Sequence, residues 1–139
     1  MKKVTRSSFL ISALGAIVAL VSATAFASVP DGGTRLKTNL TGAAIGKVTP
    51  KGAAKFASKV EHGKAEAELE VEVQKVNMAD GSVLQVVVQG GSVGSIKLAH
   101  SRGKLELRTE AGDTVPAVQK GDVITVVNAA GAVILSGTF

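Results

Sequence analysis

The chain has 139 residues, a formal net charge of +5, and no cysteine, tryptophan or tyrosine. The absence of cysteine excludes disulfides, and the absence of tryptophan and tyrosine disfavours carbohydrate recognition by ring stacking. Aliphatic side chains, chiefly Val, Leu, Ile and Ala, must therefore form the core of a single domain of ordinary size.

The first 27 residues have the pattern of a signal peptide. Three basic residues lie before position 7, residues 9–21 are mostly apolar, and residues 25–27 (AFA) supply the small residues that a signal peptidase recognises. Residues 9–27 are also just long enough for an uncleaved membrane anchor. We expect cleavage of the signal peptide (residues 1–27), which leaves an exported β domain of residues 28–139, either periplasmic or secreted.

Loss of this leader changes the charge of the exported chain. Three basic residues and no acidic residue lie before position 28, so the remaining 13 basic and 11 acidic residues give a formal net charge of +2. This small excess does not support nucleic acid as a partner.

Glycine residues divide the rest of the chain into short segments. From position 81 onward, glycines expected in turns recur every 9–12 residues, and apolar segments of strand length lie between them. Such spacing is typical of a β-sandwich or barrel. We therefore predict an all-β fold, a single-domain antiparallel sandwich or barrel-like meander of about eight short strands after the N-terminal signal peptide.

Two of the predicted strands show clear alternation. Residues 35–41 alternate apolar and polar positions, and residues 65–76 (AEAELEVEVQKV) have glutamate at every second position from 66 to 72. The second segment is rich in helix formers. On a helix, however, the residues between the glutamates would scatter around the cylinder, whereas on a strand they all face one side. We predict a strand, with a β-bulge at residues 74–76, where the alternation shifts by one position.

A hairpin with the preceding segment would offset the repulsion between neighbouring glutamates. If His62-Gly63 is a two-residue loop, Lys59 faces Glu66 and Lys55 faces Glu70 on the solvent face. The same register places four mainly apolar pairs on the other face: Val60–Ala65, Ser58–Ala67, Phe56–Leu69 and Ala54–Val71. The agreement between the charged and the apolar pairs favours this register.

Residues 50–62 also carry the marks of a helix. Thr49 fits an N-cap, Pro50 fits the first helical position, and Gly63 lies just past the end. A helix would align the lysines at positions 51, 55 and 59 and leave the glutamates as an unpartnered anionic surface. The strand is our preferred interpretation, and the helix is the alternative.

The remaining strands follow from apolar patterns. Residues 82–89 are almost continuously apolar, which indicates a central strand, and residues 104–109 place Leu105 and Leu107 on one face. Residues 115–118 include a proline, which cannot donate to a sheet ladder, so we expect a short edge strand there. Further strands are expected at residues 93–100, 122–127 and 132–139.

Charged residues on two predicted surfaces are the candidate contacts with a partner. One set is the glutamate row, and the other is a basic region with no intervening acid; together they comprise Glu66, Glu68, Glu70, Glu72, Arg35, Lys37, Lys47 and Lys51. A basic region of this kind can contact anionic lipid or polysaccharide, or it can be a solvated rim. The sequence does not define the partner; another envelope protein or an anionic polysaccharide or lipid is the expectation.

No arrangement of residues indicates catalysis or a cofactor. The two histidines, His62 and His100, have no cysteine to complete a zinc site, and the aspartates of the predicted turns lack the spacing of a calcium loop. Residues 42–48 differ from a P-loop in having three residues between the glycines and Val48 in place of Ser or Thr. No G-x-S-x-G motif is present. We expect no catalytic residue, no metal site and no cofactor, and we do not expect an enzyme.

The last residues, 131–139 (GAVILSGTF), are similar to the assembly signal of outer-membrane β-barrel proteins, which ends in phenylalanine after alternating apolar residues. Transmembrane barrels need strands of about 9–11 residues and aromatic girdles at both interfaces. The predicted strands are shorter, and tryptophan and tyrosine are missing. We therefore expect Phe139 to close one end of the core.

Three stretches together resemble a pattern found in small exported bacterial all-β domains of unassigned function. They are G-x-L-x-L-R at 103–108, V-P-x-V-x-x-G-D at 115–122 and G-x-V-x-L-S-G-x-F at 131–139. The resemblance covers roughly the second half of the chain, and it implies a fold and a compartment without functional residues. We predict an exported β domain with a non-enzymatic binding or structural role at the cell envelope. The alternative is a small outer-membrane or surface-associated β-barrel protein.

Overall fold

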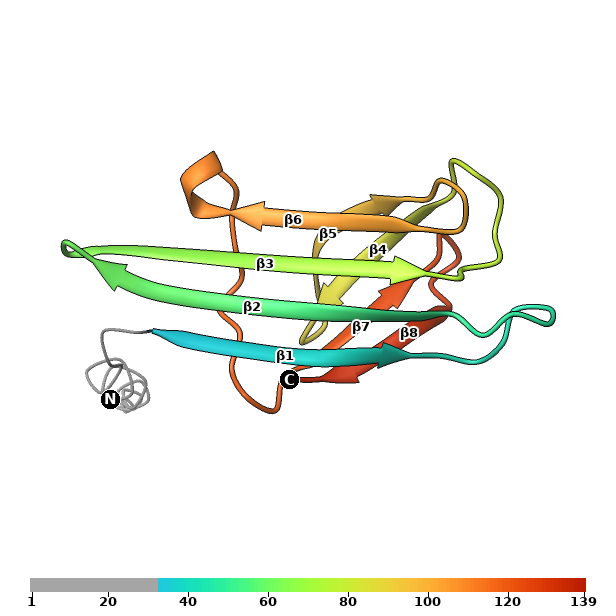
Figure 1. Cartoon of the computed structure of the whole chain (residues 1–139), viewed down its shortest axis with the longest axis horizontal. Coiled ribbons are helices and arrows are strands. Elements are labelled where there is room, and N and C mark those ends of the chain that lie inside the picture. The colour runs from blue at the N-terminus through green and yellow to red at the C-terminus, as the bar shows by residue number, and fades with distance from the viewer. Residues whose placement is uncertain (1–32) are drawn as a thin grey trace, which may run out of the picture. The chain divides into compact units, whose positions relative to one another are not determined.

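The computed structural model describes residues 33–139, of which Thr34–Phe139 form one compact antiparallel β unit (Figure 1). The predicted signal peptide and its cleavage site lie outside the described residues. Across residues 33–139 no helix has the length and hydropathy needed to cross a bilayer. The elements are β1 (Thr34–Thr41), β2 (Lys51–Glu61), β3 (Lys64–Gln74), β4 (Val83–Val88), β5 (Gly91–Lys97), β6 (Gly103–Arg108), the 3-10 turn η2 (Thr109–Ala111), β7 (Val123–Val127) and β8 (Val133–Thr138).

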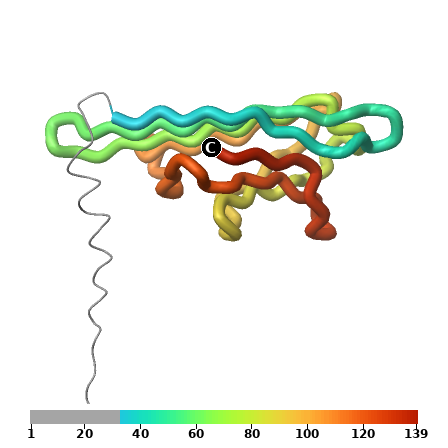
Figure 2. The backbone as a smooth tube through the Cα atoms, turned by 90° about the horizontal axis from the view of Figure 1, so that it is seen from below, coloured from blue at the N-terminus to red at the C-terminus, as the bar shows by residue number. Residues whose placement is uncertain are grey.

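The eight strands form one antiparallel sheet, in the order β5-β4-β7-β8-β1-β2-β3-β6, that curves into a nearly closed barrel. β1, β2, β3 and β6 make one layer, and β4, β5, β7 and β8 make the other, as the two views of the chain show (Figures 1 and 2). One residue pair, Thr41 with Ser136, joins the layers where β1 meets β8. The all-β prediction of an antiparallel sandwich or barrel-like fold is confirmed.

The strand order departs from a simple meander at three places. β3 pairs with β6, β4 with β7, and β8 with β1, whereas the other neighbouring strands follow one another in the chain. The chain passes from one layer to the other after β3, after β5 and after β6. The chain crosses between layers because each hairpin has one apolar face, which can be buried only against the opposite layer. The glycine spacing predicts the turns but not these crossings.

The core lies between the two layers and is aliphatic apart from two phenylalanines. Within residues 33–139 no polar or charged residue is buried. Phe139 belongs to the core, as expected from the sequence. The buried residues are Leu40, Ala54, Phe56, Leu69, Val71, Val73, Val76, Leu84, Val86, Val88, Ile96, Leu98, Val118, Ile124, Val126, Leu135 and Phe139. Hydrophobic burial, without buried hydrogen-bonding side chains, therefore holds the two layers together.

The predicted β2–β3 hairpin is confirmed in its register. All six predicted pairs are present, including Lys59 with Glu66 and Lys55 with Glu70. The loop residues His62 and Gly63 have φ angles of 51° and 76°, which is the positive-φ backbone that a two-residue type I′ turn requires. The helix considered for residues 50–62 is wrong, because the alternation that buries Ala54 and Phe56 fits a strand packed against a second layer.

Two local predictions need correction. The predicted bulge at residues 74–76 is the end of β3, since Lys75 adopts a left-handed φ of 59° and turns the chain so that Val76 enters the core. The predicted edge strand at residues 115–118 is irregular backbone instead. Val118 in this segment is nevertheless buried in the core. An apolar residue can therefore be buried here without belonging to a strand.

A tight turn brings the two outermost strands of the sheet order together. His100 and Ser101 have φ angles of 54° and 65°, and the flanking Ala99 and Arg102 exchange backbone hydrogen bonds of 2.9 and 3.1 Å. At this turn β5 of one layer continues into β6 of the other, opposite the junction of β1 and β8. We call this contact the β5–β6 seam.

Candidate functional site

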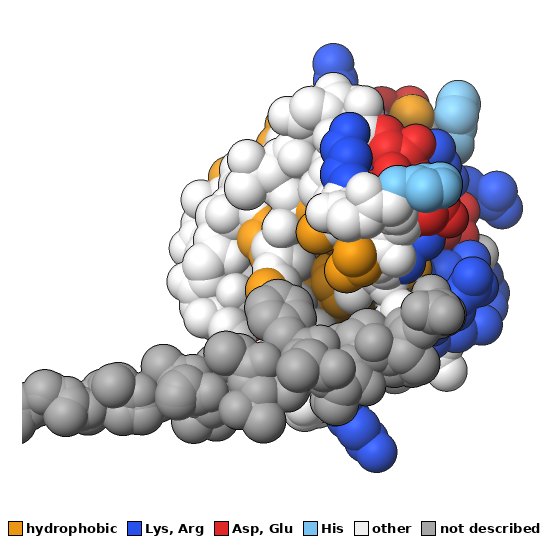
Figure 3. All heavy atoms as spheres, turned by 90° about the vertical axis from the view of Figure 1, so that its left-hand side faces the viewer, with side chains coloured by type: hydrophobic (Ala, Val, Ile, Leu, Met, Phe, Trp, Pro, Cys, Tyr) orange, Lys and Arg blue, Asp and Glu red, His pale blue; other side chains and the backbone are white. Residues whose placement is uncertain are grey.

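The solvent-facing side of β1, β2, β3 and β6 carries charge in bands, and we call it the banded face. The charged residues that face outward are basic on β1, basic on β2 apart from Glu61, acidic on β3 from Glu66 to Glu72, and of both signs on β6. Figure 3 shows the basic and acidic side chains gathered on one side of the molecule. The outward charged residues named below are Arg35, Lys37, Lys51, Lys55, Lys59, Glu66, Glu68, Glu70, Glu72, Lys104, Glu106 and Arg108.

The opposite layer differs sharply in charge. The strands β4, β5, β7 and β8 contain one charged residue, Lys97. Exposed aliphatic residues occur there instead, with Val83 and Val123 each 45% exposed and Val133 60% exposed. Any interaction that depends on charge must therefore use the banded face or the turns at the ends of the strands.

Lysines of β2 neutralise two glutamates of β3, as predicted from the hairpin register. Lys55 Nζ lies 3.4 Å from Glu70 Oε1, and Lys59 Nζ lies 3.5 Å from Glu66 Oε1. Lys59 is shared with Glu61, whose Oε2 is 3.3 Å away. The hydrogen bond to Glu61, with the nearby charge of Glu66, raises the pKa of Lys59 above its usual value.

The basic residues of β6 neutralise the glutamate row from its other side. Lys104 Nζ lies 2.7 Å from Glu70 Oε2, and Arg108 Nε lies 2.7 Å from Glu68 Oε2. Arg108 also binds Glu106 at 3.1 Å, and the charges of Glu106 and Glu68 raise the pKa of the guanidinium. The sequence interpretation missed this second set of partners. The alternation of Lys104, Glu106 and Arg108 beside a glutamate row was the available signal.

Glu70 is the centre of the ion-pair network. The sheet register places Glu70 directly opposite Glu106, a like-charge pair that would be unfavourable alone. The hydrogen bond from Lys104, supported by Lys55, lowers the pKa of Glu70 below its usual value although partial burial acts in the opposite direction. These exposed pairs each contribute only about 0.2–1 kcal/mol, so their main role is to fix the register of three strands.

A hollow of about 360 Å³ interrupts the banded face between β1 and β3. Its position follows from the register, which aligns Arg35, Ala57 and Glu68 across three strands. Because Ala57 carries only a methyl group, the basic and acidic side chains on either side stand apart by two strand spacings, roughly 10 Å. The hollow is lined by Arg35, Leu36, Lys37, Lys55, Phe56, Ala57, Glu68 and Glu70.

The charges around the hollow are unequally neutralised. Glu68 and Glu70 have basic partners on β2 or β6, as described above. Arg35 and Lys37, within the part of the chain that the structure describes, make no ion pair within 4 Å. The hollow therefore presents unpaired positive charge on its β1 side and already neutralised negative charge on its β3 side.

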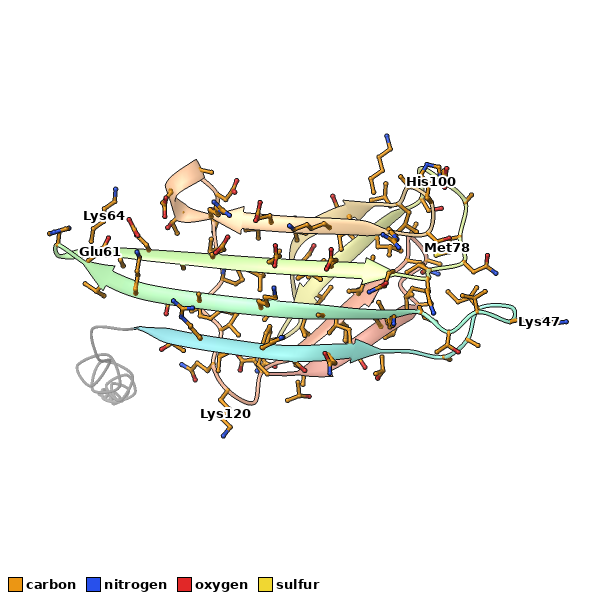
Figure 4. The ribbon with its side chains drawn as sticks, viewed as in Figure 1. Lys47, Glu61, Lys64, Met78, His100 and Lys120 are labelled. Carbon is orange, nitrogen blue, oxygen red and sulfur yellow. The ribbon has the colours of Figure 1, made fainter. Side chains whose placement is uncertain are left out.

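The structure separates the other predicted contact residues from this hollow. Lys51 begins β2 and pairs with Thr41 and Gln74, several residues along the strands from Lys55. Lys47 is in the β1–β2 loop, and Figure 4 places it at the end of the molecule opposite Glu61 and Lys64. Glu72, among residues 33–139, makes no ion pair within 4 Å. Of the predicted basic region, Arg35 and Lys37 alone line the hollow.

The described residues contain no group of three or more His, Asp or Glu side chains placed to hold a metal ion. His62 and His100 occupy separate two-residue turns, one at the β2–β3 tip and one at the β5–β6 seam. The histidines thus have structural positions in tight turns, where positive φ is needed.

Comparison of the chain with family models, curated proteins and solved structures finds no match. The resemblance to small exported β domains therefore stays a prediction from the sequence. What the chain binds must be argued from the banded face and its hollow.

Proposed function

We propose that the chain is an exported, non-enzymatic binding domain of the cell envelope. Its banded face holds a partner through acid groups on that partner, with Arg35 and Lys37 as the principal contacts. The observation that carries the proposal is the hollow lined by these two residues, which have no ion pair within 4 Å among residues 33–139.

The charge balance of the face supports an anionic partner over a cationic one. Lysines and arginine of the same sheet already occupy the carboxylates of Glu66, Glu68 and Glu70. At the hollow, a cationic partner would have to displace the basic partners of Glu68 and Glu70, whereas an anionic group meets Arg35 and Lys37 with no ion pair to break. Since exposed charges are screened beyond about 8–10 Å at physiological salt, the acid groups must sit in or beside the hollow.

The alternative of a small outer-membrane barrel has less support from the outer surface. A lipid-facing barrel needs an apolar outward band around all its strands. Here four adjacent strands direct lysine, arginine and glutamate side chains outward. A surface-associated domain held by its partner agrees better with this distribution.

Export and binding can be tested with the full-length coding sequence in a bacterial host. Fractionation and intact mass measurement test export, and we expect an extracytoplasmic protein that begins at Ser28. A cytoplasmic protein that retains its leader would contradict this part of the proposal.

Binding is tested with polygalacturonate, phosphatidylglycerol vesicles and an acidic peptide as probes. The variant Arg35→Glu/Lys37→Glu is compared with a control of equal charge change, Lys97→Glu/Lys120→Glu, outside the banded face. We expect at least one probe to bind the natural sequence, to bind less tightly at high salt, and to lose roughly tenfold or more in affinity with the first variant only. Equal losses in both variants, or no binding of any probe, would refute the proposal.

A further inference from the structure

One edge of β1 is unpaired along most of the strand in the part of the chain that the structure describes. β2 pairs with β1 from Thr34 to Thr41, whereas β8 pairs with it only at Thr41, opposite Ser136. Within residues 33–139, no strand pairs with the other edge of β1 between Thr34 and Thr38. Unpaired strand edges present backbone groups to which another extended segment can bind.

The register shows which backbone groups lie on this edge. A two-residue turn makes Glu61 and Lys64 a hydrogen-bonded pair, and hydrogen-bonded pairs then alternate along β2. Residues of β2 such as Phe56 therefore direct their N–H and C=O toward β1, where Phe56 meets Leu36. It follows that Arg35 and Lys37 direct their backbone N–H and C=O toward the open edge.

The side chains at this edge alternate in the same way as those that β3 meets on β2. Arg35 and Lys37 face outward, and Leu36 between them is turned inward and packs against the core. On β2, Lys55 faces outward toward Glu70 while Phe56 faces inward beside Leu69. β3 thus shows what kind of strand suits a neighbour with outward lysines and inward apolar residues: glutamates outside and aliphatic residues inside.

We propose that the open edge of β1 accepts an extended segment of an envelope protein as an added strand. This segment carries acidic residues at alternate positions, opposite Arg35 and Lys37, and aliphatic residues between them, toward Leu36. The inference rests on the proposed function and specifies its partner class as protein. Backbone hydrogen bonds provide the attachment, and the two basic side chains select the acidic alternation.

The open edge is short, so binding of the added strand depends on backbone hydrogen bonds and on ion pairs together. Only Arg35 and Lys37 supply free backbone groups in the stretch from Thr34 to Thr38, and exposed ion pairs are individually weak. Basic residues on an edge also keep copies of the same chain from pairing there. If Arg35 and Lys37 served only to prevent pairing between copies of the chain, no acidic strand should bind. Binding of such a strand therefore separates protection of the edge from recognition of a partner.

The experiment uses a synthetic peptide with the sequence AEAELEVEV, which has the required alternation and corresponds to residues 65–73. Binding to the exported protein is followed by NMR titration and by hydrogen exchange of the Arg35 and Lys37 amides. One control peptide has the same composition with its glutamates contiguous. A second control is the AEAELEVEV peptide N-methylated at alternate residues, which blocks backbone pairing on one edge and leaves all charges in place.

We expect AEAELEVEV to bind and to slow exchange at both amides, and both control peptides to bind roughly tenfold more weakly. In the protein, Lys37→Ala removes one charge and should weaken binding less than about fivefold. Lys37→Pro also removes the edge N–H, is tolerated on an edge strand, and should weaken binding by roughly tenfold more than Lys37→Ala.

The outcomes separate this inference from the proposed function. Equal binding of all three peptides would overturn strand addition. So would binding of polygalacturonate or phosphatidylglycerol vesicles when AEAELEVEV itself does not bind. Either result would leave anionic binding at Arg35 and Lys37 standing. Failure of every anionic probe to bind would overturn both.

Discussion

Substitution of Gly103 by alanine should weaken the β5–β6 seam. A Cβ atom at position 103 would overlap Cγ2 of Ile96, a fully buried residue of β5, and would lie 3.2 Å from the carbonyl oxygen of Lys97. The backbone of Gly103 does not have a positive φ, so alanine is excluded by space rather than by conformation.

The magnitude follows from two opposing effects. Overpacking of a core typically costs about 1–3 kcal/mol, and an overlap with a buried methyl group belongs in the upper part of that range. Replacing glycine by alanine at a compatible backbone position recovers about 0.4–1 kcal/mol through the unfolded state. We therefore expect Gly103→Ala to lower the free energy of unfolding by about 1–2 kcal/mol, which is roughly 0.5–1 M in the urea midpoint.

Two controls make the prediction specific. Gly91→Ala, at the start of β5, has no atom closer than 3.8 Å to the added methyl group and no positive φ, so it should be neutral or slightly stabilising. Ile96→Leu removes the β-branch that carries Cγ2, so Gly103→Ala should cost less in that background than alone. If Gly91→Ala and Gly103→Ala have the same effect, or if the Ile96 and Gly103 effects simply add, the packing argument is refuted.

Three further predictions concern the core, the ion pairs of Glu70 and the β2–β3 turn. Leu69→Ala, at a fully buried position, should lower the free energy of unfolding by about 2–5 kcal/mol in urea titrations. Val60→Ala, at a 56% exposed position, should lower it by less than about 0.5 kcal/mol. Similar losses in the two variants would contradict the assigned core. Because Lys104 lowers the pKa of Glu70 in the fold, its stabilisation is complete above the usual value of 4.5 and is lost as the pH falls through the folded pKa. Glu70→Gln should therefore flatten the decrease in stability below about pH 5 in acid titrations, and an unchanged decrease would count against the network. His62→Asn should raise the unfolding midpoint slightly, since asparagine adopts the φ of 51° at this turn more readily than histidine; a lower midpoint would contradict the turn assignment.

The local part of the fold could be predicted because several patterns agreed within one hairpin. The alternation of Glu68, Leu69 and Glu70 selected a strand, and His62-Gly63 supplied turn chemistry at the position that aligned two lysines with two glutamates. Helix signals at Thr49 and Pro50 were present but local. They gave way because β2 pairs with both β1 and β3 in the sheet and buries its apolar face against the opposite layer.

The pairing of β3 with β6 was not predictable in the same way. The two strands are separated by a hairpin of the opposite layer, so no turn geometry fixes their register. The candidate site depends on this long-range order: Lys104 and Arg108 neutralise the glutamate row, and Arg35 and Lys37 are thereby left as the distinctive charges of the hollow. The sequence indicated the basic and acidic residues, and the sheet order showed which of them are already paired.

The interior, within residues 33–139, contains no buried polar residue, so a slip of two residues, which keeps the apolar side chains inward, is opposed inside the domain only by shape and volume. The information that selects a single arrangement is carried at the solvent surface, by cross-strand charges and tight turns. During evolution the interior could exchange Leu and Ile at nearly constant volume and modest cost, whereas a change of sign at a surface position such as Glu70 would act on the alignment of three strands at once.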